Sequence, residues 1–244
     1  MRQQSPRYAI YYVPERDTAL ERLGSSLLGR DIRTGGFLPQ PGLRGIAPDE
    51  LFMLTRDARR YGLHATLKSP FFLKPGVTEE ELVQAAQRFC EARRAFSLPA
   101  LALDRIDSFF ALVMHPQDEE EYGDAENVQM MAQDAVVFFD GFRAPPSAEE
   151  LDRRRSKGLT ARQEECLIQW GYPYVLDEFR FHITLTDPVL HAGLAAVLEA
   201  GLRRYMAPAV EHNRIGAISV CRSDFAGNFT LLHRTELAVA AQSL

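Results

Sequence analysis

The sequence contains few cysteines, and their arrangement suggests no chemistry. Only three of its 244 residues are cysteine, and Cys90, Cys166 and Cys221 lie far apart with no CxxC pair among them. This number and spacing argue against a disulfide framework and against a thiolate metal site. We expect all three to be reduced thiols that fill the core.

Long apolar runs and an excess of positive charge are also missing. No stretch reaches about 18 apolar residues, and the first residues lack the apolar segment of a secretory signal. We therefore expect a cytoplasmic protein that contacts no membrane. The formal net charge of −5 provides no overall field that would attract duplex nucleic acid. An anionic ligand must be held by a local site instead.

One short motif is present twice. YGLHATL at 61–67 and FRFHITL at 179–185 both contain His, any residue, Thr, Leu, with the two histidines 118 positions apart (182 − 64). The Phe of the last strand expected in each half follows the motif histidine by 45 residues in the first half (109 − 64) and by 47 in the second (229 − 182). The agreement indicates an internal duplication.

Hydrophobic periodicity predicts strands and helices in the same order in both halves. The expected strands are 7–13, 61–67, 98–106 and 108–116 in the first half and 179–185, 214–220 and 228–239 in the second. Between the halves, apolar residues at a spacing of three to four predict helices. Capping patterns mark the helix starts, at Thr78 with Glu81, Ser147 with Glu150, and Thr160 with Gln163.

These elements predict an α+β fold. We expect two duplicated α/β lobes related by a pseudo-twofold axis, with antiparallel sheets around a central cleft and a helical insertion. The predicted boundaries are 1–117 for the first lobe, 118–172 for the insertion and 173–244 for the second lobe, all within one compact bilobal domain.

Each motif strand should have one polar face, because side chains two residues apart point the same way in a strand. The polar faces are expected to carry His64, Thr66 and Lys68 in the first copy and Arg180, His182 and Thr184 in the second. If the lobes face each other across a cleft, the two imidazoles meet at one ligand. One imidazole can then accept a proton while the other donates one, and the threonine hydroxyls can hold phosphate oxygens. Such a site cleaves a phosphodiester without a metal ion or cofactor.

HATL and HITL, one in each half of a duplicated α/β chain, resemble the motifs of the two-histidine (2H) phosphoesterase superfamily. RYAIYY, YGLHATLKSPF, WGYPYV and FRFHITLTDP are similar to its DUF1045-like branch, which is found beside phosphonate-degradation operons. The resemblance implies a metal-independent phosphodiesterase with His64 and His182 as catalytic residues and Thr66 and Thr184 as phosphate-binding residues. It also implies a small cyclic phosphate of a sugar or nucleotide as substrate, within phosphonate metabolism; other relatives act on RNA ends.

Several residues near the motif strands are candidates for substrate contacts. Aromatic rings can stack on a base or sugar, and cations can neutralise phosphate, although such residues also occur in ordinary cores and rims. The candidates are Tyr12, Tyr61, Lys68, Tyr174 and Arg180, with Trp170 as a further aromatic residue nearby. Arg222 and Asp224 are expected in a hairpin.

Other interpretations of the pattern remain open. His115 and His233 each follow a motif histidine by 51 residues (115 − 64 and 233 − 182), so four histidines could form a metal site, although no carboxylate accompanies them. The basic run 153–157, which contains Arg153, Arg154, Arg155 and Lys157, is interpreted as a solvated helix face, with phosphate contact as the alternative. The main functional alternative is a non-catalytic module that binds a nucleotide or RNA end; a third is an insertion that serves as a partner surface.

Overall fold

The computed structural model describes residues 5–156 and 158–238. The strands are β1 (Arg7–Tyr12), β2 (Ala65–Phe72), β3 (Phe96–Leu98), β4 (Leu101–Ile106), β5 (Phe109–Met114), β6 (His182–Thr184), β7 (Asn213–Ile215), β8 (Ala217–Ser223) and β9 (Phe229–Glu236). The α-helices are α1 (Ala19–Leu28), α2 (Pro48–Leu54), α3 (Arg56–Tyr61), α4 (Glu79–Glu91), α5 (Glu119–Phe138), α6 (Ala148–Arg155), α7 (Ala161–Trp170) and α8 (Ala192–Met206).

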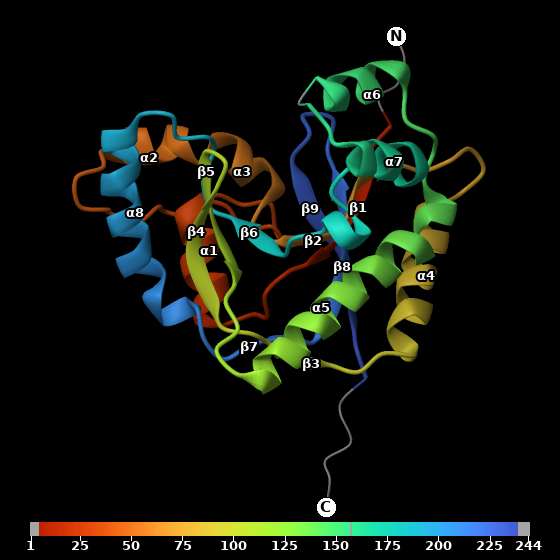
Figure 1. The fold of residues 1–244 in the computed structure, drawn as a ribbon, viewed down its shortest axis with the longest axis horizontal. Coiled ribbons are helices and arrows are strands. Elements are labelled where there is room, and N and C mark those ends of the chain that lie inside the picture. Colours follow the sequence, from red (N-terminus) through yellow and green to blue (C-terminus); the bar gives the residue numbers. More distant parts are fainter. Residues whose placement is uncertain (1–4, 157, 239–244) are drawn as a thin grey trace, which may run out of the picture.

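Seven of these strands form one antiparallel sheet in the order β4-β5-β6-β2-β1-β8-β9 (Figure 1). The two motif strands, β2 and β6, lie next to each other in the middle of the sheet, where Ala65 pairs with Ile183. Strands β3 and β7 form a separate antiparallel pair. The sheet order therefore brings both copies of the motif to the centre of the molecule.

Equivalent elements of the two halves contact each other, as expected for copies related by a twofold axis. β2 pairs with β6, and β3 pairs with β7. The helix that follows each motif packs on strands of the other half: α4 contacts β8 and β9, and α8 contacts β4. The predicted α+β fold with duplicated units is confirmed. The strands of the two halves are interleaved in one sheet, and the boundaries at 117 and 172 remain a prediction.

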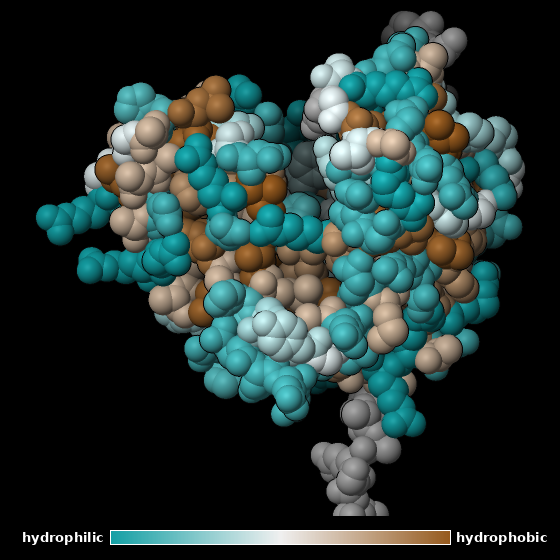
Figure 2. All heavy atoms as spheres, viewed as in Figure 1, coloured by the Kyte–Doolittle hydropathy of each residue, from teal (hydrophilic) through white to brown (hydrophobic). Residues whose placement is uncertain are grey.

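The two faces of the sheet have different roles. The main core lies on one face and includes Ile10, Leu67 and Ile183 together with apolar residues of α1, α4, α5 and α8. The opposite face carries a smaller apolar cluster that includes Tyr11 and Phe229. Figure 2 shows an indentation between the left-hand and right-hand parts of the molecule, each of which contains elements of both sequence halves. Because side chains alternate along a strand, His64 and Thr66 point away from the main core.

A bulge in β2 changes this alternation after Thr66. Thr66 pairs with Tyr11, whereas Lys68 pairs with Ile10, so β2 contains one extra residue between the two pairs. Paired residues point to the same side of a sheet, and neighbouring residues of β1 point to opposite sides. Lys68 therefore lies on the core side, and the predicted sharing of one face with His64 is wrong for this residue.

The insertion consists of the predicted helices. Ser147 and Thr160 accept hydrogen bonds from backbone nitrogens three residues later and cap α6 and α7, and Thr78 caps α4 with the predicted Glu81 partner. α6 and α7 lie above the right-hand half of the sheet in Figure 1. Trp170 packs against a small apolar cluster of Val136, Cys166 and Val175.

The three cysteines are buried free thiols, as predicted. Among the helices of residues 5–156 and 158–238, none is long and apolar enough to span a bilayer.

Candidate active site

The two motif histidines are held in the same way. Nδ1 of His64 lies 2.8 Å from the carbonyl oxygen of Gly62, and Nδ1 of His182 lies 2.8 Å from the carbonyl oxygen of Arg180. A carbonyl oxygen can only accept, so these contacts assign the proton of each neutral ring to Nδ1. Nε2 is then the basic nitrogen of both rings.

The central residue pair between β2 and β6 fixes how the four polar motif residues are arranged. Continuing its antiparallel register by one residue on each side places His64 opposite Thr184 and Thr66 opposite His182. All four point away from the main core. The two histidines are diagonal neighbours, and such positions lie about 7–8 Å apart in antiparallel sheets. One phosphate group can therefore contact both imidazoles.

Burial makes both imidazoles harder to protonate. It lowers the pKa of His64 from 6.5 to about 4; the hydrogen bond to Gly62 opposes this shift, and the nearby His182 adds to it. The Tyr11 ring stacks on His64 with centroids 3.9 Å apart and contributes to this burial. The pKa of His182 is also lowered, mainly by burial. Both rings are therefore neutral near pH 7 in the unliganded protein.

A cavity of about 480 Å³ opens over the cleft side of the motif strands. Its wall includes His64, Thr66 and Thr184. His182 lies just outside this wall, with its ring centroid 6.1 Å from that of Phe109, which is part of the wall. The cavity thus brings together three of the four motif residues and adjoins the fourth.

Among the predicted substrate contacts, Tyr61 is part of the cavity wall. Its ring stacks on Phe229 at 5.3 Å and lies 6.2 Å from the ring of His64. Tyr12 is only 2% exposed and belongs to the main core, beside Phe181. The prediction for Tyr12 is therefore wrong; its neighbour Tyr11 faces the cavity.

Lys68 is buried away from the cavity. Its Nζ donates to the carbonyl oxygen of Val136 at 2.8 Å and to Asp140 at 3.0 Å, both across the core in or just after α5. Burial lowers the pKa of this amine to about 8. The predicted substrate contact is wrong because the bulge turns this side chain toward the helix.

Tyr174 and Arg180 also lie outside the cavity wall. Tyr174 is exposed and packs edge to face on Tyr172, which is in the wall. Arg180 forms an ion pair with Asp104 at 2.6 Å, and its backbone carbonyl orients His182. Neither side chain lines the cavity, and the predicted substrate contacts of these two residues stay predictions.

The cavity wall also contains residues that were not candidates for substrate contact, among them Arg7, Tyr11 and Tyr172, and two arginines of the basic run, Arg153 and Arg154. β1 is apolar on both faces, so its sequence could not show which tyrosine faces the cleft. In the basic run, the Arg153 side chain is 67% exposed, as expected for a solvated face, whereas the Arg154 side chain is only 16% exposed; Lys157 lies outside the described residues. The alternative interpretation of this run, contact with phosphate, stays a prediction.

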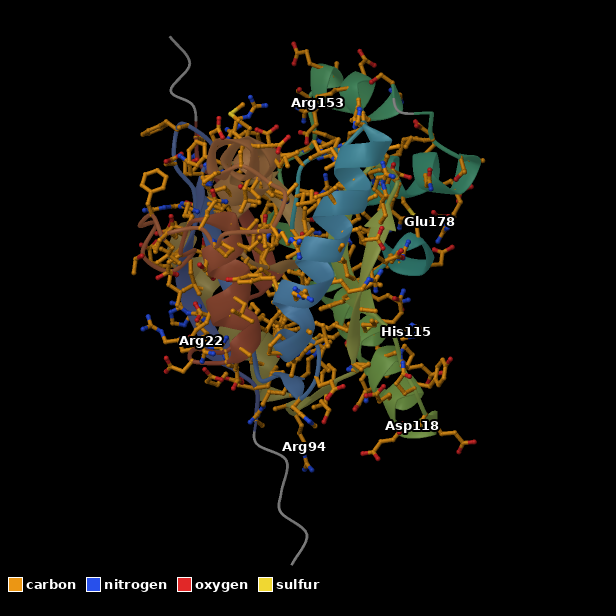
Figure 3. The ribbon with its side chains drawn as sticks, turned by 90° about the vertical axis from the view of Figure 1, so that its left-hand side faces the viewer. Arg22, Arg94, His115, Asp118, Arg153 and Glu178 are labelled. Carbon is orange, nitrogen blue, oxygen red and sulfur yellow. The ribbon has the colours of Figure 1, made fainter. Side chains whose placement is uncertain are left out.

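His115 and His233 do not join the motif histidines. His115 follows β5 and lies near Asp118, far from Arg153 of the cavity wall (Figure 3). His233 lies on β9 opposite Val220. Within the described part of the chain, no three His, Cys, Asp or Glu side chains come close enough to hold a metal ion. The alternative four-histidine site is therefore not assembled.

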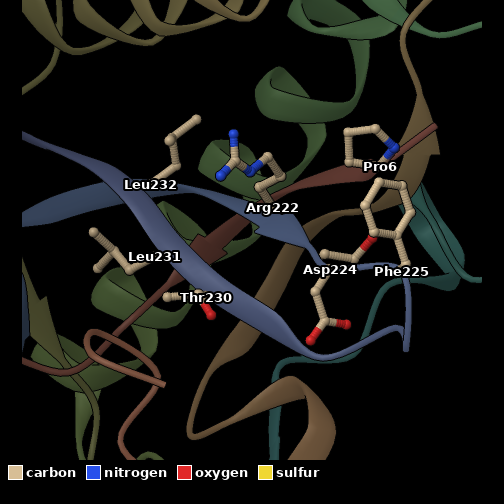
Figure 4. A pocket seen from close by; sticks show the side chains of 8 residues that line it. Pro6, Arg222, Asp224, Phe225, Thr230, Leu231 and Leu232 are labelled. Atoms are coloured by element: carbon tan, nitrogen blue, oxygen red, sulfur yellow. The ribbon is translucent and has the colours of Figure 1, made fainter. Parts of the chain in front are cut away.

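A separate cavity of about 440 Å³ lies beside the β8–β9 hairpin and is lined by residues that include Arg222, Asp224 and Phe225 (Figure 4). Arg222 forms an ion pair with Glu79 at 3.1 Å, and Asp224 accepts hydrogen bonds from Asn228. Both residues belong to the hairpin, as predicted. None of the four polar motif residues lines this cavity.

Two curated bacterial proteins are similar to this chain, and both are named ribose 1,5-bisphosphate phosphokinase PhnN. The protein from Janthinobacterium sp. (strain Marseille) is 38% identical over 225 residues, which cover 91% of this chain and 48% of the relative. The protein from Laribacter hongkongensis (strain HLHK9) is 31% identical over 182 residues, which cover 74% of this chain and 40% of the relative. The chain thus spans about half the length of these relatives.

Solved structures with a similar arrangement include E. coli LigT complexed with 3′-AMP, at 14% identity and a TM-score of 0.38, and its apo form, at 15% and 0.39. Each alignment covers 96% of this chain and 99% of the other. A likeness of this extent says nothing about activity. A family model matches residues 66–230, which is more than half of the chain. The resemblance seen in the sequence is confirmed: the chain belongs to the family described as "Protein of unknown function (DUF1045)".

Proposed function

We propose that this protein is a metal-independent phosphodiesterase that opens a small cyclic phosphodiester by general acid–base catalysis with His64 and His182. One observation carries the proposal. Each imidazole contacts a backbone carbonyl two residues earlier through Nδ1, and each therefore offers Nε2 to a ligand. The register of β2 and β6 puts the two rings on one face as diagonal neighbours.

In the proposed reaction, one phosphate lies between the rings. One imidazole accepts a proton from water at Nε2 while the water oxygen forms a bond to phosphorus. The bond between phosphorus and the leaving oxygen breaks, and the other histidine donates its Nε2 proton to that oxygen. Thr66 and Thr184 donate hydrogen bonds to the non-bridging oxygens, where negative charge accumulates. The histidines then regain their starting states by proton exchange with solvent.

The lowered pKa of both imidazoles fits this scheme once an anion binds. A nearby negative charge favours the protonated form of an imidazole. The phosphodiester therefore helps to create the imidazolium that its own cleavage requires. Because the charge of His182 disfavours protonation of His64, only one of the two rings is expected to be an imidazolium, with a second proton on Nε2.

We place the substrate among the cyclic phosphates of ribose. The curated relatives are named for a kinase of ribose 1,5-bisphosphate, and this chain matches about half of their length. Opening a ribose 1,2-cyclic phosphate at the oxygen of carbon 2 leaves a phosphate on carbon 1, one of the two positions in that name. Together with the sequence resemblance to a phosphonate-associated branch, this supports a role in phosphonate metabolism.

The test is hydrolysis of cyclic phosphates by the wild-type protein and three alanine variants with a chelator present. His64→Ala and His182→Ala should each lower turnover of ribose 1,2-cyclic phosphate or a nucleoside 2′,3′-cyclic phosphate by ~10²–10⁴, the usual effect of losing a positioned acid or base. His115→Ala is the matched control, because this exposed histidine lies outside the cavity.

Turnover that is unchanged in both motif variants would exclude the catalytic assignment. Intact cyclic phosphate recovered after long incubation with the wild-type protein, together with saturable binding, would identify a binding module instead.

A further inference from the structure

Three arginines form part of the wall of the same cavity, and the proposed acid–base mechanism uses none of them. Arg7 belongs to β1, and Arg153 and Arg154 belong to α6 of the insertion. Arg155, the next residue of the same helix, is not part of the wall and pairs with Glu164 at 2.6 Å. The helix therefore turns two of its three consecutive arginines toward the cavity.

The positive charge of this cluster exceeds the negative charge beside it. A single carboxylate, Glu150, contacts both helix arginines, at 2.8 Å from Arg154 and 4.0 Å from Arg153. The guanidinium of Arg7 lies 5.6 Å from the centre of the Phe229 ring and has no ion-pair partner among the described residues. Two of the three arginines thus share one carboxylate, and the third has no carboxylate partner among the described residues.

The guanidinium of Arg154 is held by its neighbours, but one of its hydrogen-bond donors has no partner. Its side chain is 16% exposed, and its guanidinium lies 4.8 Å above the ring of Tyr172, another wall residue. Its buried Nε has no hydrogen-bond partner. A buried donor without a partner is costly, and an anion in the cavity would satisfy it.

The carboxylates of the cavity are on the side of α3. Asp187 accepts hydrogen bonds from the backbone nitrogens of Asp57 and Ala58 at 2.8–3.1 Å, and Asp57 lies 3.4 Å from Arg56. These contacts compensate the two negative charges locally. An anionic group of a ligand is therefore expected beside the arginines.

We propose that Arg7, Arg153 and Arg154 form a second anion subsite, which binds a phosphate group of the substrate that is not cleaved. The inference rests on the proposed function and narrows it to cyclic phosphates that carry a second phosphate. A cyclic phosphodiester has one negative charge, whereas a phosphate monoester adds about 1.5 to 2 more. Guanidinium groups bind such a phosphate through paired charge-assisted hydrogen bonds.

The size of the cavity agrees with this class of substrate. A volume of about 480 Å³ lies within the usual range for small-molecule sites, about 300–1,000 Å³, and suits a sugar with two phosphates. The subsite also gives the insertion a role, because α6 supplies two of its three cations.

The experiment compares ribose 1,2-cyclic phosphate with its 5-phosphorylated counterpart. The measured quantity is the ratio of kcat/KM for the phosphorylated substrate to that for the plain one. The Arg153→Gln, Arg154→Gln double variant should reduce this ratio by ~10–10², the effect of losing one or two charge-assisted hydrogen bonds. The matched control, Arg155→Gln on the same helix, should keep the wild-type ratio. An unchanged ratio in the double variant overturns the subsite.

A binding measurement separates this inference from the proposed function. D-ribose 5-phosphate contains a phosphate monoester but no cyclic phosphodiester that the enzyme could cleave. Calorimetry should show that it binds more weakly to the double variant than to the wild type and the Arg155→Gln control. Arg153→Gln alone repeats the test without risk to the fold, because that side chain is 67% exposed. No binding to the wild type, or equal binding to all variants, overturns the subsite. Arginine-dependent binding in a protein that opens no cyclic phosphate would leave the subsite standing and remove the catalytic proposal.

Discussion

At the scale of single residues, the two imidazoles share a cause for their lowered pKa but differ in its extent. Tyr11 stacks directly on His64, and burial lowers the pKa of His64 to about 4. His182 lies beside Arg180, whose charge adds a smaller effect to that of burial. His64 therefore has the stronger tendency to stay neutral, and we expect it to be the base and His182 the acid.

This assignment predicts the pH dependence of the reaction. The base must be neutral and the acid protonated, so kcat/KM should fall at low pH with the pKa of His64 and at high pH with that of His182. Both values lie below the ordinary 6.5 in the free protein, which places the optimum of kcat/KM on the acidic side of pH 6.5. A bound anion raises both values, and the optimum of kcat should lie at higher pH.

Rate profiles of the wild type from pH 4 to 8 measure both optima. The residual activity of His64→Ala should lose the acidic limb, and that of His182→Ala should lose the alkaline limb. A flat wild-type profile would contradict an acid–base pair. If His64→Ala lost the alkaline limb and His182→Ala the acidic limb, His64 would be the acid and His182 the base.

The sequence could predict the motif residues but not all of their neighbours. His64, Thr66, His182 and Thr184 were found because the motif occurs twice with matched spacing. The choice of Tyr12 over Tyr11 could not be corrected from sequence, since β1 is buried on both faces and has no polar side to set its orientation.

At the scale of helices and strands, Lys68 connects β2 to the end of α5. Its amine donates to the carbonyl oxygen of Val136, in the last turn of the helix, where carbonyls lack helical partners. The helix has no basic residue of its own in that turn. A cation from the strand therefore takes the place of a C-terminal basic residue and interacts favourably with the helix dipole.

Replacing Lys68 should consequently affect stability and not catalysis. Lys68→Met keeps the unbranched, apolar part of the side chain but removes its hydrogen bonds to Val136 and Asp140, and should lower the free energy of unfolding by about 1.5–3 kcal/mol. Urea denaturation measures this loss. The exposed Lys74→Met is the control and should change stability by less than about 0.5 kcal/mol.

The activity of each folded Lys68→Met molecule should equal that of the wild type. A selective increase of KM for the cyclic phosphate without loss of stability would show instead that Lys68 contacts the substrate.

Prediction from the sequence succeeded where an element depends on local signals. The caps at Thr78, Ser147 and Thr160 gave the starts of three helices. It failed where neighbours decide: the bulge that turns Lys68 depends on pairing with β1. α6 has no buried residue, so its sequence could not show that Arg153 and Arg154 face a cavity.

At the scale of the whole molecule, the two sequence halves complete each other. β5 of the first half pairs with β6 of the second, and β1, near the start of the described chain, pairs with β8 near its end. α4 and α8 each cover strands of the opposite half. The cavity over the motif strands is therefore lined by residues of both halves, and neither half contains a complete set of partners for its own strands.

This interleaving predicts that the sequence segments do not fold alone. A fragment of residues 1–117 would expose the apolar face of α4 that packs on β8 and β9, and would leave the edges of β1 and β5 unpaired. We expect fragments 1–117 and 173–244 to give poorly dispersed amide NMR spectra and no cooperative thermal transition, with the full chain as control. A well-dispersed spectrum and a cooperative transition for 1–117 alone would show that the sequence lobes are structural domains. In that case the interleaved strands would pair only after each lobe has folded, because the 1–117 fragment would keep its core and its cooperative unfolding without the partner strands.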